Sequence, residues 1–136
     1  MDDSSGGIPP LNRGLAGYLR AVAEAVGVPV EATSFEISDT ATAYLGLTRR
    51  WTLRPGEDLM LVWSERDGWA VAVETVPGEA PVVLAYFAGD DVVPTPAAVA
   101  RFVTEVIATG PSGAPRPDFP TTVAREELTE RLAPYA

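Results

Sequence analysis

The sequence predicts a two-layer α+β domain, in which two long amphipathic helices cover an antiparallel five-stranded sheet. Three observations predict it: a helical stripe of apolar residues near the start, alternating apolar and polar residues in the middle, and a second helical stripe near residue 100. The chain has 136 residues, enough for one domain with its own core. We expect a disordered leader over 1–10, a single α+β domain over 11–109, and a Pro/Gly-rich linker with a short C-terminal helix over 110–136.

The first helix is predicted over residues 12–26. Its apolar residues recur at spacings of three and four: Leu11, Leu15, Leu19, Val22 and Val26. Asn12 is a suitable N-cap, and Gly27 stands where a helix commonly ends. Gly14 and Gly17 lie inside the helix, where each costs about 1 kcal/mol relative to Ala. They are either tolerated glycines or positions that another backbone approaches closely.

Two hairpins are predicted from the period-2 pattern that follows. The first joins strands over 33–38 and 41–47 through a turn at 39–40, and the second joins strands over 58–63 and 69–74. In the second of these four strands, alternate residues form an apolar face: Ala41, Ala43, Leu45 and Leu47. Thr42 and Tyr44 then point to the opposite side of the sheet.

The register of the second hairpin decides which side chains share a face. A two-residue turn at Asp67-Gly68 would mix large and small side chains on both faces, so we predict a three-residue loop over 66–68 with left-handed Gly68. That register pairs Trp63 with Val71. It collects the bulky side chains on one face: Leu59, Leu61, Trp63, Trp69, Val71 and Val73. The other face receives Met60, Val62, Ala70, Ala72 and Glu74.

A fifth strand over 82–88 and a helix over 96–109 complete the predicted domain. The strand is almost wholly apolar. For the helix, Thr95 is a good N-cap, Pro96 suits the first position, and Gly110 suits the end. Its apolar stripe contains Val99, Phe102, Val103, Val106 and Ile107.

The remaining segments are predicted to be loops and one short helix. A loop is expected over 49–57 and a turn over 76–81, because both contain Pro-Gly. The short helix is expected from Thr121 to Leu132, supported by an ion pair between Glu127 and Arg131.

The chain contains no His, Cys, Lys or Gln, and this restricts its chemistry. Without His there is no Ser–His pair and no His-liganded zinc, and without Cys or Lys there is no thiol redox chemistry or Schiff base. The net charge of −9 disfavours nucleic acid and anionic membranes as partners. No apolar run approaches the ~20 residues of a membrane span. We therefore expect a cytoplasmic, non-enzymatic protein without a cofactor or metal.

Four segments of the chain have a distinctive sequence: GLAGYLRAV at 14–22, DLMLVW at 58–63, GWAVAVE at 68–74 and PAAVARFV at 96–103. Together they resemble an uncharacterised actinobacterial family of small acidic proteins, a domain of unknown function, over residues 11–108. The resemblance implies a bacterial, cytoplasmic origin. It brings no activity, ligand or catalytic residue with it.

The apolar second face of the sheet is the best functional clue. It carries Met60, Val62, Ala70 and Ala72, which are too apolar for a solvated face and too small for a rich core. Either a helix of the same chain covers this face, or it is a protein interface, most simply of a two-fold homodimer. The leading hypothesis is a protein-interaction module. The alternative is a small-molecule site between helices and sheet, near Tyr44, Trp63, Trp69 and Tyr86.

Charged clusters give weaker signals. Two acidic pairs lie at the edges of elements: Glu57-Asp58 and Asp90-Asp91. Their spacing matches no calcium loop, so we interpret them as solvated turns. One basic cluster is present: Arg49, Arg50 and Arg54 beside Trp51. It is either an exposed loop or a docking site for an acidic partner.

Overall fold

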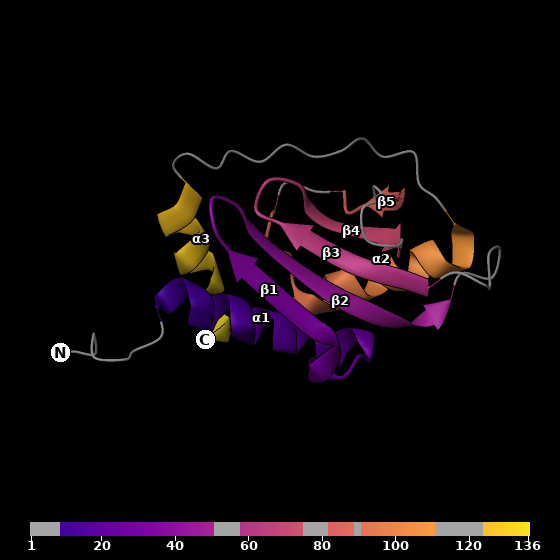
Figure 1. The fold of residues 1–136 in the computed structure, drawn as a ribbon, viewed down its shortest axis with the longest axis horizontal. Helices are drawn as coiled ribbons and strands as arrows, with labels where there is room; N and C mark the ends of the chain where they lie inside the picture. Colours follow the sequence, from indigo (N-terminus) through magenta and orange to yellow (C-terminus); the bar gives the residue numbers. More distant parts are fainter. Residues whose placement is uncertain (1–8, 51–57, 75–81, 89–90, 111–123) are drawn as a thin grey trace.

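The computed structural model describes residues 9–50, 58–74, 82–88, 91–110 and 124–136. Over these residues the chain forms an antiparallel meander of five strands in the order β1-β2-β3-β4-β5, with helices before and after it (Figure 1). The predicted α+β class is confirmed. The helices are α1 (Pro10–Val26), α2 (Pro96–Thr109) and α3 (Ala124–Leu132), with 3-10 turns η1 (Val30–Ala32) and η2 (Ala133–Tyr135). The strands are β1 (Thr33–Ile37), β2 (Ala41–Arg50), β3 (Asp58–Ser64), β4 (Gly68–Val73) and β5 (Val82–Tyr86).

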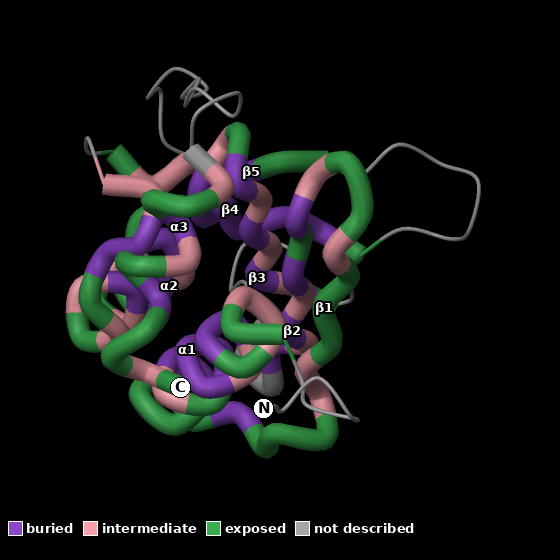
Figure 2. The backbone as a smooth tube through the Cα atoms, turned by 90° about the vertical axis from the view of Figure 1, so that its left-hand side faces the viewer, coloured by how far each residue is buried: buried purple, intermediate pink, exposed green. Residues whose placement is uncertain are grey.

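The two long helices lie on one side of the sheet, as the turned view makes clear (Figure 2). We call the sheet face toward α1 and α2 the inner face, and the opposite one the outer face. The inner face carries the apolar series predicted for the two hairpins, and all of it is buried: Ala41, Ala43, Leu45, Leu47, Leu59, Leu61, Trp63, Trp69, Val71 and Val73. The described helices include none long and apolar enough to cross a membrane.

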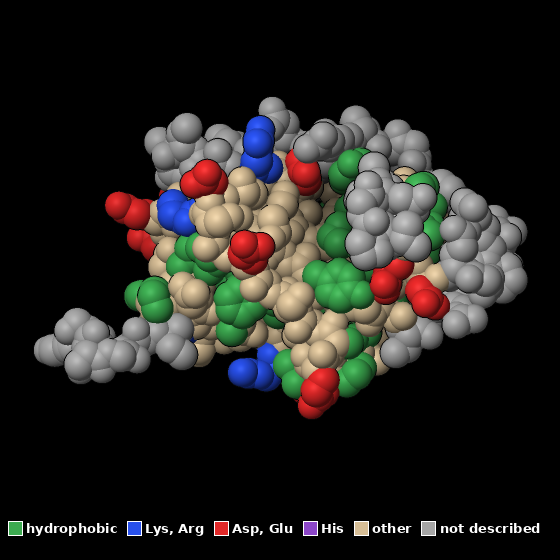
Figure 3. Space-filling view, in the orientation of Figure 1, with side chains coloured by type: hydrophobic (Ala, Val, Ile, Leu, Met, Phe, Trp, Pro, Cys, Tyr) green, Lys and Arg blue, Asp and Glu red, His purple; other side chains and the backbone are tan. Residues whose placement is uncertain are grey.

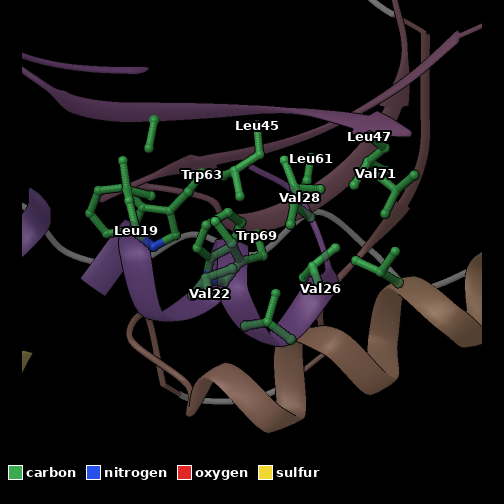
Figure 4. Packing of buried hydrophobic residues seen from close by; sticks show 14 of the residues in the cluster. Leu19, Val22, Val26, Val28, Leu45, Leu47, Leu61, Trp63, Trp69 and Val71 are labelled. Carbon is green, nitrogen blue, oxygen red and sulfur yellow. The ribbon is translucent and has the colours of Figure 1, made fainter. Parts of the chain in front are cut away.

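Buried hydrophobic side chains pack between the helices and the sheet (Figure 4), and aromatic side chains of this core also make hydrogen bonds. The indole Nε1 of Trp63 donates to the carbonyl of Val92 (2.7 Å), and that of Trp69 donates to the Tyr18 hydroxyl (3.0 Å). The Tyr18 hydroxyl in turn donates to the carbonyl of Pro94. Burial raises the pKa of Tyr18, so this hydroxyl stays protonated. The segment leading into α2 is thereby fixed to the sheet.

The register between β3 and β4 corrects the prediction by two residues. The structure pairs Trp63 with Trp69, where the sequence predicted Trp63 with Val71, and the loop spans 65–67 instead of 66–68. A shift of two residues leaves every side chain on the face it was assigned. The predicted faces are therefore right although the predicted partners are wrong.

Local hydrogen bonds explain the observed turn. The Ser64 hydroxyl accepts from the backbone N–H of Arg66 (3.2 Å) and of Asp67 (2.9 Å), which stabilises the loop directly after β3. Gly68 has φ of 71° and begins β4 in the left-handed region. The predicted register would have paired Glu65 with Trp69, but Glu65 lies in the turn and is 3% exposed.

The helix ends agree with the sequence at three of four positions. Gly27 ends α1 in the left-handed conformation, the Thr95 side chain caps α2, and Gly110 closes it with φ of 89°. The N-terminus of α1 is the exception. The helix begins at Pro10, and Asn12 lies inside its first turn instead of serving as N-cap. Proline suits a first helical position, because the N–H that it lacks would have no partner within the helix there.

The C-terminal segment packs on α1 and belongs to the same unit as the rest of the fold. Leu128 and Leu132 are buried in the common core. Gly14 and Gly17 make this packing possible, since a Cβ at Gly17 would lie 1.7 Å from the carbonyl oxygen of Tyr135, and one at Gly14 would lie 2.8 Å from Leu132 Cβ. Of the two interpretations of these glycines, close backbone approach is the correct one.

Two arginines tie α3 to the rest of the chain. Arg125 bonds the Glu65 carboxylate (2.7 Å), whose side chain is 2% exposed. Arg131 bonds Asp91 and not Glu127, so the predicted ion pair within the helix is replaced by one between segments. The first residues of the predicted helix, 121–123, lie outside the described residues, as do 1–8, 51–57 and 75–81.

Candidate interaction surface

The structure brings the four predicted interface residues together on the outer face. Met60 lies in register with Ala72, and Val62 with Ala70, on the central strands β3 and β4. The two alanines are buried, whereas Met60 and Val62 are partly exposed. Small side chains thus form the floor and larger ones the walls.

This arrangement leaves a hollow of about 320 Å³ along β3 and β4, which we call the outer groove. Beside the four residues already named, β5 contributes Val83 and Tyr86, which pair with Ala72 and Ala70. Thr42 and Ser64 line it as well. The lining is therefore mainly apolar and open to solvent.

One end of the outer groove carries a tyrosine and two carboxylates. The Tyr44 hydroxyl donates to Oε2 of Glu74 (3.0 Å). Its ring occupies the space above Gly46, where an added Cβ would lie 3.2 Å from the hydroxyl. The pKa of Tyr44 is raised, first by burial, then by the bond to Glu74 and the charges of Glu74 and Asp58. Glu74 and Asp58 place negative charge near this hydroxyl.

The charged side chains described at outer-face positions of the strands are acidic: Glu36 on β1, Asp58 on β3, and Glu74 directly after β4. Asp67, in the turn before β4, lines the opposite end of the groove. Figure 3 views the molecule from this side and shows acidic side chains beside the hydrophobic ones. The surface is apolar in its centre and negative at its ends.

The four residues of the alternative ligand pocket are not brought together. Trp63 and Trp69 are 1% exposed, lie on the inner face, and are held by hydrogen bonds within the core. Tyr44 and Tyr86 lie on the outer face, at positions in register with Val62 and Ala70. Helix side chains fill the space between helices and sheet (Figure 4).

Sequence reasoning missed the contribution of β5 to the outer face. Val83 and Tyr86 both lie on it although they are three positions apart, because an irregularity opposite Val71 and Ala72 places Leu84 out of register. Strict alternation would have sent one of them to the inner face. A bulge of this kind leaves no clear signal in a wholly apolar strand.

A second hollow, of about 400 Å³, lies between the end of β5 and α2. Arg101 and Glu105 line it one helical turn apart, beside Phe87 and Phe102, which meet edge to face. It is larger than the outer groove, but opposite charges and a satisfied aromatic pair line it. We regard the outer groove as the stronger candidate because its centre is uniformly apolar.

The charged clusters noted in the sequence form no described site. Asp91 accepts from the backbone N–H of Val93 (2.9 Å) and bonds Arg131, so it stabilises the turn before α2. Within the described part of the chain, no three acidic side chains are grouped to hold a metal ion. Glu57, Asp90 and residues 51–57 of the basic segment lie outside the described residues, as do the side chains of Arg49 and Arg50.

Fold and surface together define a two-layer α+β domain with helices on one sheet face and an apolar groove on the other. The chain matches DUF6292, a family of unknown function, over residues 18–105, and it belongs to this family. No curated protein and no solved structure matches it. The matched range contains β1–β5 and therefore the whole outer groove, whereas α3 lies beyond it.

Proposed function

We propose that this chain is a non-enzymatic protein-interaction module that binds its partner through the outer groove. The observation that carries the proposal is the apolar centre of the groove, Met60, Val62, Ala70 and Ala72, on the sheet face opposite the helices. Apolar surface of this kind on a folded domain is characteristic of interaction sites.

The arrangement of the helices supports this proposal over burial within the chain. Both long helices pack toward the inner face, and α3 packs on α1. In the described ranges, no helix lies over the outer face. The first of the two sequence interpretations, in which a long helix covers this face, therefore loses its support.

The side chains of the groove favour binding over catalysis. Its floor and walls are aliphatic or aromatic, and its polar groups are hydroxyls and carboxylates. The chain has no His, Cys or Lys with which to activate a hydroxyl as a nucleophile. A protein partner, which needs apolar area and a polar rim, fits this composition.

The test compares two valines replaced by the same residue. Val62→Asp places a charge in the groove, and Val30→Asp places one at η1, where Val30 is 49% exposed and outside the groove. A buried unpaired charge at a contact costs several kcal/mol. We expect a partner cross-linked in native extract to be retained by Val30→Asp and lost by Val62→Asp, with both variants folded by circular dichroism.

The same Val62→Asp variant also tests the predicted homodimer. Sedimentation of the purified chain over a range of concentrations reports a second copy as partner, and Val62→Asp should then reduce the mass to that of a monomer. Partners captured equally by wild type and Val62→Asp, with no change in mass, would contradict the proposed function.

A further inference from the structure

A second open surface lies at the edge of the sheet that β1 forms. β1 is the first strand of the sheet and pairs with β2 alone among the described strands, so its other side carries backbone N–H and C=O groups without a strand partner (Figure 1). Its three middle residues, Ser34, Phe35 and Glu36, are exposed. This edge can therefore accept a sixth strand.

Phe35 is a large apolar side chain that the helices leave partly open. It lies in register with Ala43, which belongs to the buried inner face, and yet Phe35 is 36% exposed. Val30, in η1 just before β1, is 49% exposed. Burial of apolar surface is favourable, so a partner that covers these two side chains gains binding energy from both.

A hollow of about 340 Å³ lies between α1, η1 and β1, and we call it the edge hollow. Its lining includes Ala16, Leu19 and Arg20 of α1, together with Val30 and Phe35. A strand added beside β1 would lie about 4.8 Å further out, and every second side chain on it would point toward the helix layer. These side chains would enter the edge hollow, because α1 already forms its wall.

The edge of β1 lacks most of the features by which proteins block the addition of a strand. Natural edge strands are commonly protected by Pro, by Lys, by a bulge or by a charge that points inward. β1 has the sequence TSFEI and pairs with β2 in continuous register. Its one charged side chain, Glu36, lies in register with Thr42 on the outer face and does not line the edge hollow.

We propose that β1 binds an extended segment of another protein as a sixth strand, with one apolar and one acidic side chain of that segment in the edge hollow. Backbone hydrogen bonds to β1 would hold the segment, and the hollow would select its side chains. The acidic side chain would meet Arg20, whose exposed guanidinium makes no ion pair or hydrogen bond within the described part of the chain. The edge hollow and the outer groove share no described lining residue, so this second binding surface goes beyond the proposed function and does not depend on it.

A second copy of this chain is a less suitable occupant of the edge than another protein. Pairing of two β1 strands would direct into the hollow the residues that β1 itself carries on its inner side: Thr33, Phe35 and Ile37. None of them is acidic, so Arg20 would stay without a partner. A segment with an apolar residue and an Asp or Glu satisfies both the apolar and the charged part of the lining.

The experiment selects peptides from a random library displayed on phage, with the immobilised full chain as target. Val30→Asp and Val62→Asp are selected in parallel, because the first places a carboxylate in the edge hollow and the second changes only the outer groove. We expect peptides that are enriched on the wild type and on Val62→Asp but lost on Val30→Asp. They should carry Asp or Glu two positions from an apolar residue, because side chains two positions apart in a strand share a face.

Two measurements on one such peptide test its contacts with the chain. In fluorescence anisotropy it should bind Arg20→Gln about threefold more weakly than the wild type, and with less salt dependence. Arg20 is exposed, so this variant keeps the fold. In hydrogen exchange, bound peptide should slow the exchange of amides in β1, because the added strand accepts bonds from the open edge.

Each other outcome would overturn a stated part of the proposal. Equal enrichment on Val30→Asp, or no enrichment at all, would overturn the edge hollow as a binding site. Peptides that bind without slowing exchange in β1 would overturn the added strand, and peptides that bind Arg20→Gln as tightly as the wild type would overturn the acidic partner. A wild type that dimerises with slow exchange in β1 would show that the occupant is a second copy. Peptides lost on Val62→Asp alone would support the outer groove and contradict the edge.

Discussion

The inner and outer faces of one sheet differ in side-chain volume and in how their polar groups are satisfied. On β3 and β4 the inner face holds two tryptophans, two leucines and two valines, all buried, with both indole N–H groups bonded. The outer face of the same strands holds Met60, Val62 and two alanines, with carboxylates at its ends. The inner face has the composition of a completed core. The outer face is apolar, and a hollow remains over it, which is why we propose that it binds a partner.

The largest expected effect is a difference in stability between two variants, each with one Val→Asp substitution, one on the inner face and one on the outer face. Val71→Asp buries a charge among helix side chains on the inner face, and we expect a loss of more than about 4 kcal/mol or no folded protein. Val62→Asp on the outer face should lower the free energy of unfolding by about 1 kcal/mol or less. Urea denaturation measures both. Equal losses would mean that the outer face is also core.

Two glycines with crowded surroundings provide the second comparison. Gly17→Ala places a methyl group against the backbone of Tyr135, which cannot move without undocking the C-terminal segment, so we expect a loss of about 3 kcal/mol. Gly46→Ala meets only the end of the Tyr44 side chain and should cost about 1 kcal/mol or less. Since alanine favours helix over glycine, a stabilised Gly17→Ala would refute the close packing on α1.

Two tyrosine hydroxyls provide the third comparison. Tyr18→Phe leaves the buried indole N–H of Trp69 and the carbonyl of Pro94 without their partner, and we expect a loss of about 2 kcal/mol. Tyr44→Phe removes one exposed bond to Glu74 and should change stability by about 0.5 kcal/mol. Thermal unfolding of the two variants measures both losses. Similar losses of stability from Tyr18→Phe and Tyr44→Phe would contradict the distinction between a buried and an exposed hydroxyl.

The smallest effect concerns Gly68, the glycine that follows the turn between β3 and β4. Gly68 has φ of 71°, so Gly68→Ala should cost about 1 kcal/mol. Gly68→Asn should cost less, because asparagine tolerates the left-handed conformation better. Denaturation midpoints that decrease from the wild type to Gly68→Asn and then to Gly68→Ala would support the observed turn. Identical midpoints for the three proteins would contradict it.

The sequence predicted the faces of the sheet better than the contacts between its segments. Alternation of apolar residues is a local property, so Leu61 and Val62 were assigned to opposite faces correctly even though the register was two residues off. Local bonds of the Ser64 hydroxyl hold the observed turn, and Glu65 within it accepts a bond from the backbone N–H of Ala41 (2.7 Å), a contact between distant turns. A bond between residues this far apart in the sequence cannot be predicted from a local pattern.

The docking of α3 and the full set of residues that line the groove could not be predicted from local patterns either, because both depend on contacts between distant parts of the chain. Gly14 and Gly17 were recognised as unusual, but their partners Leu132 and Tyr135 lie more than a hundred residues away. For the site, Met60 and Val62 could be identified from alternation, whereas Val83 depended on a bulge. Tertiary contacts decide these features, and they follow only from the folded chain.

The most direct test of the outer face uses the absence of cysteine from the chain. Val62→Cys and Val71→Cys each introduce a single thiol, on the outer and the inner face of neighbouring strands. With a maleimide under native conditions, we expect the thiol of Val62→Cys to react at a rate close to that of the unfolded chain. The thiol of Val71→Cys should react at least about a thousandfold more slowly, because it requires unfolding. Equally slow reaction of both thiols would show that the outer face is covered and would contradict its assignment as a binding surface.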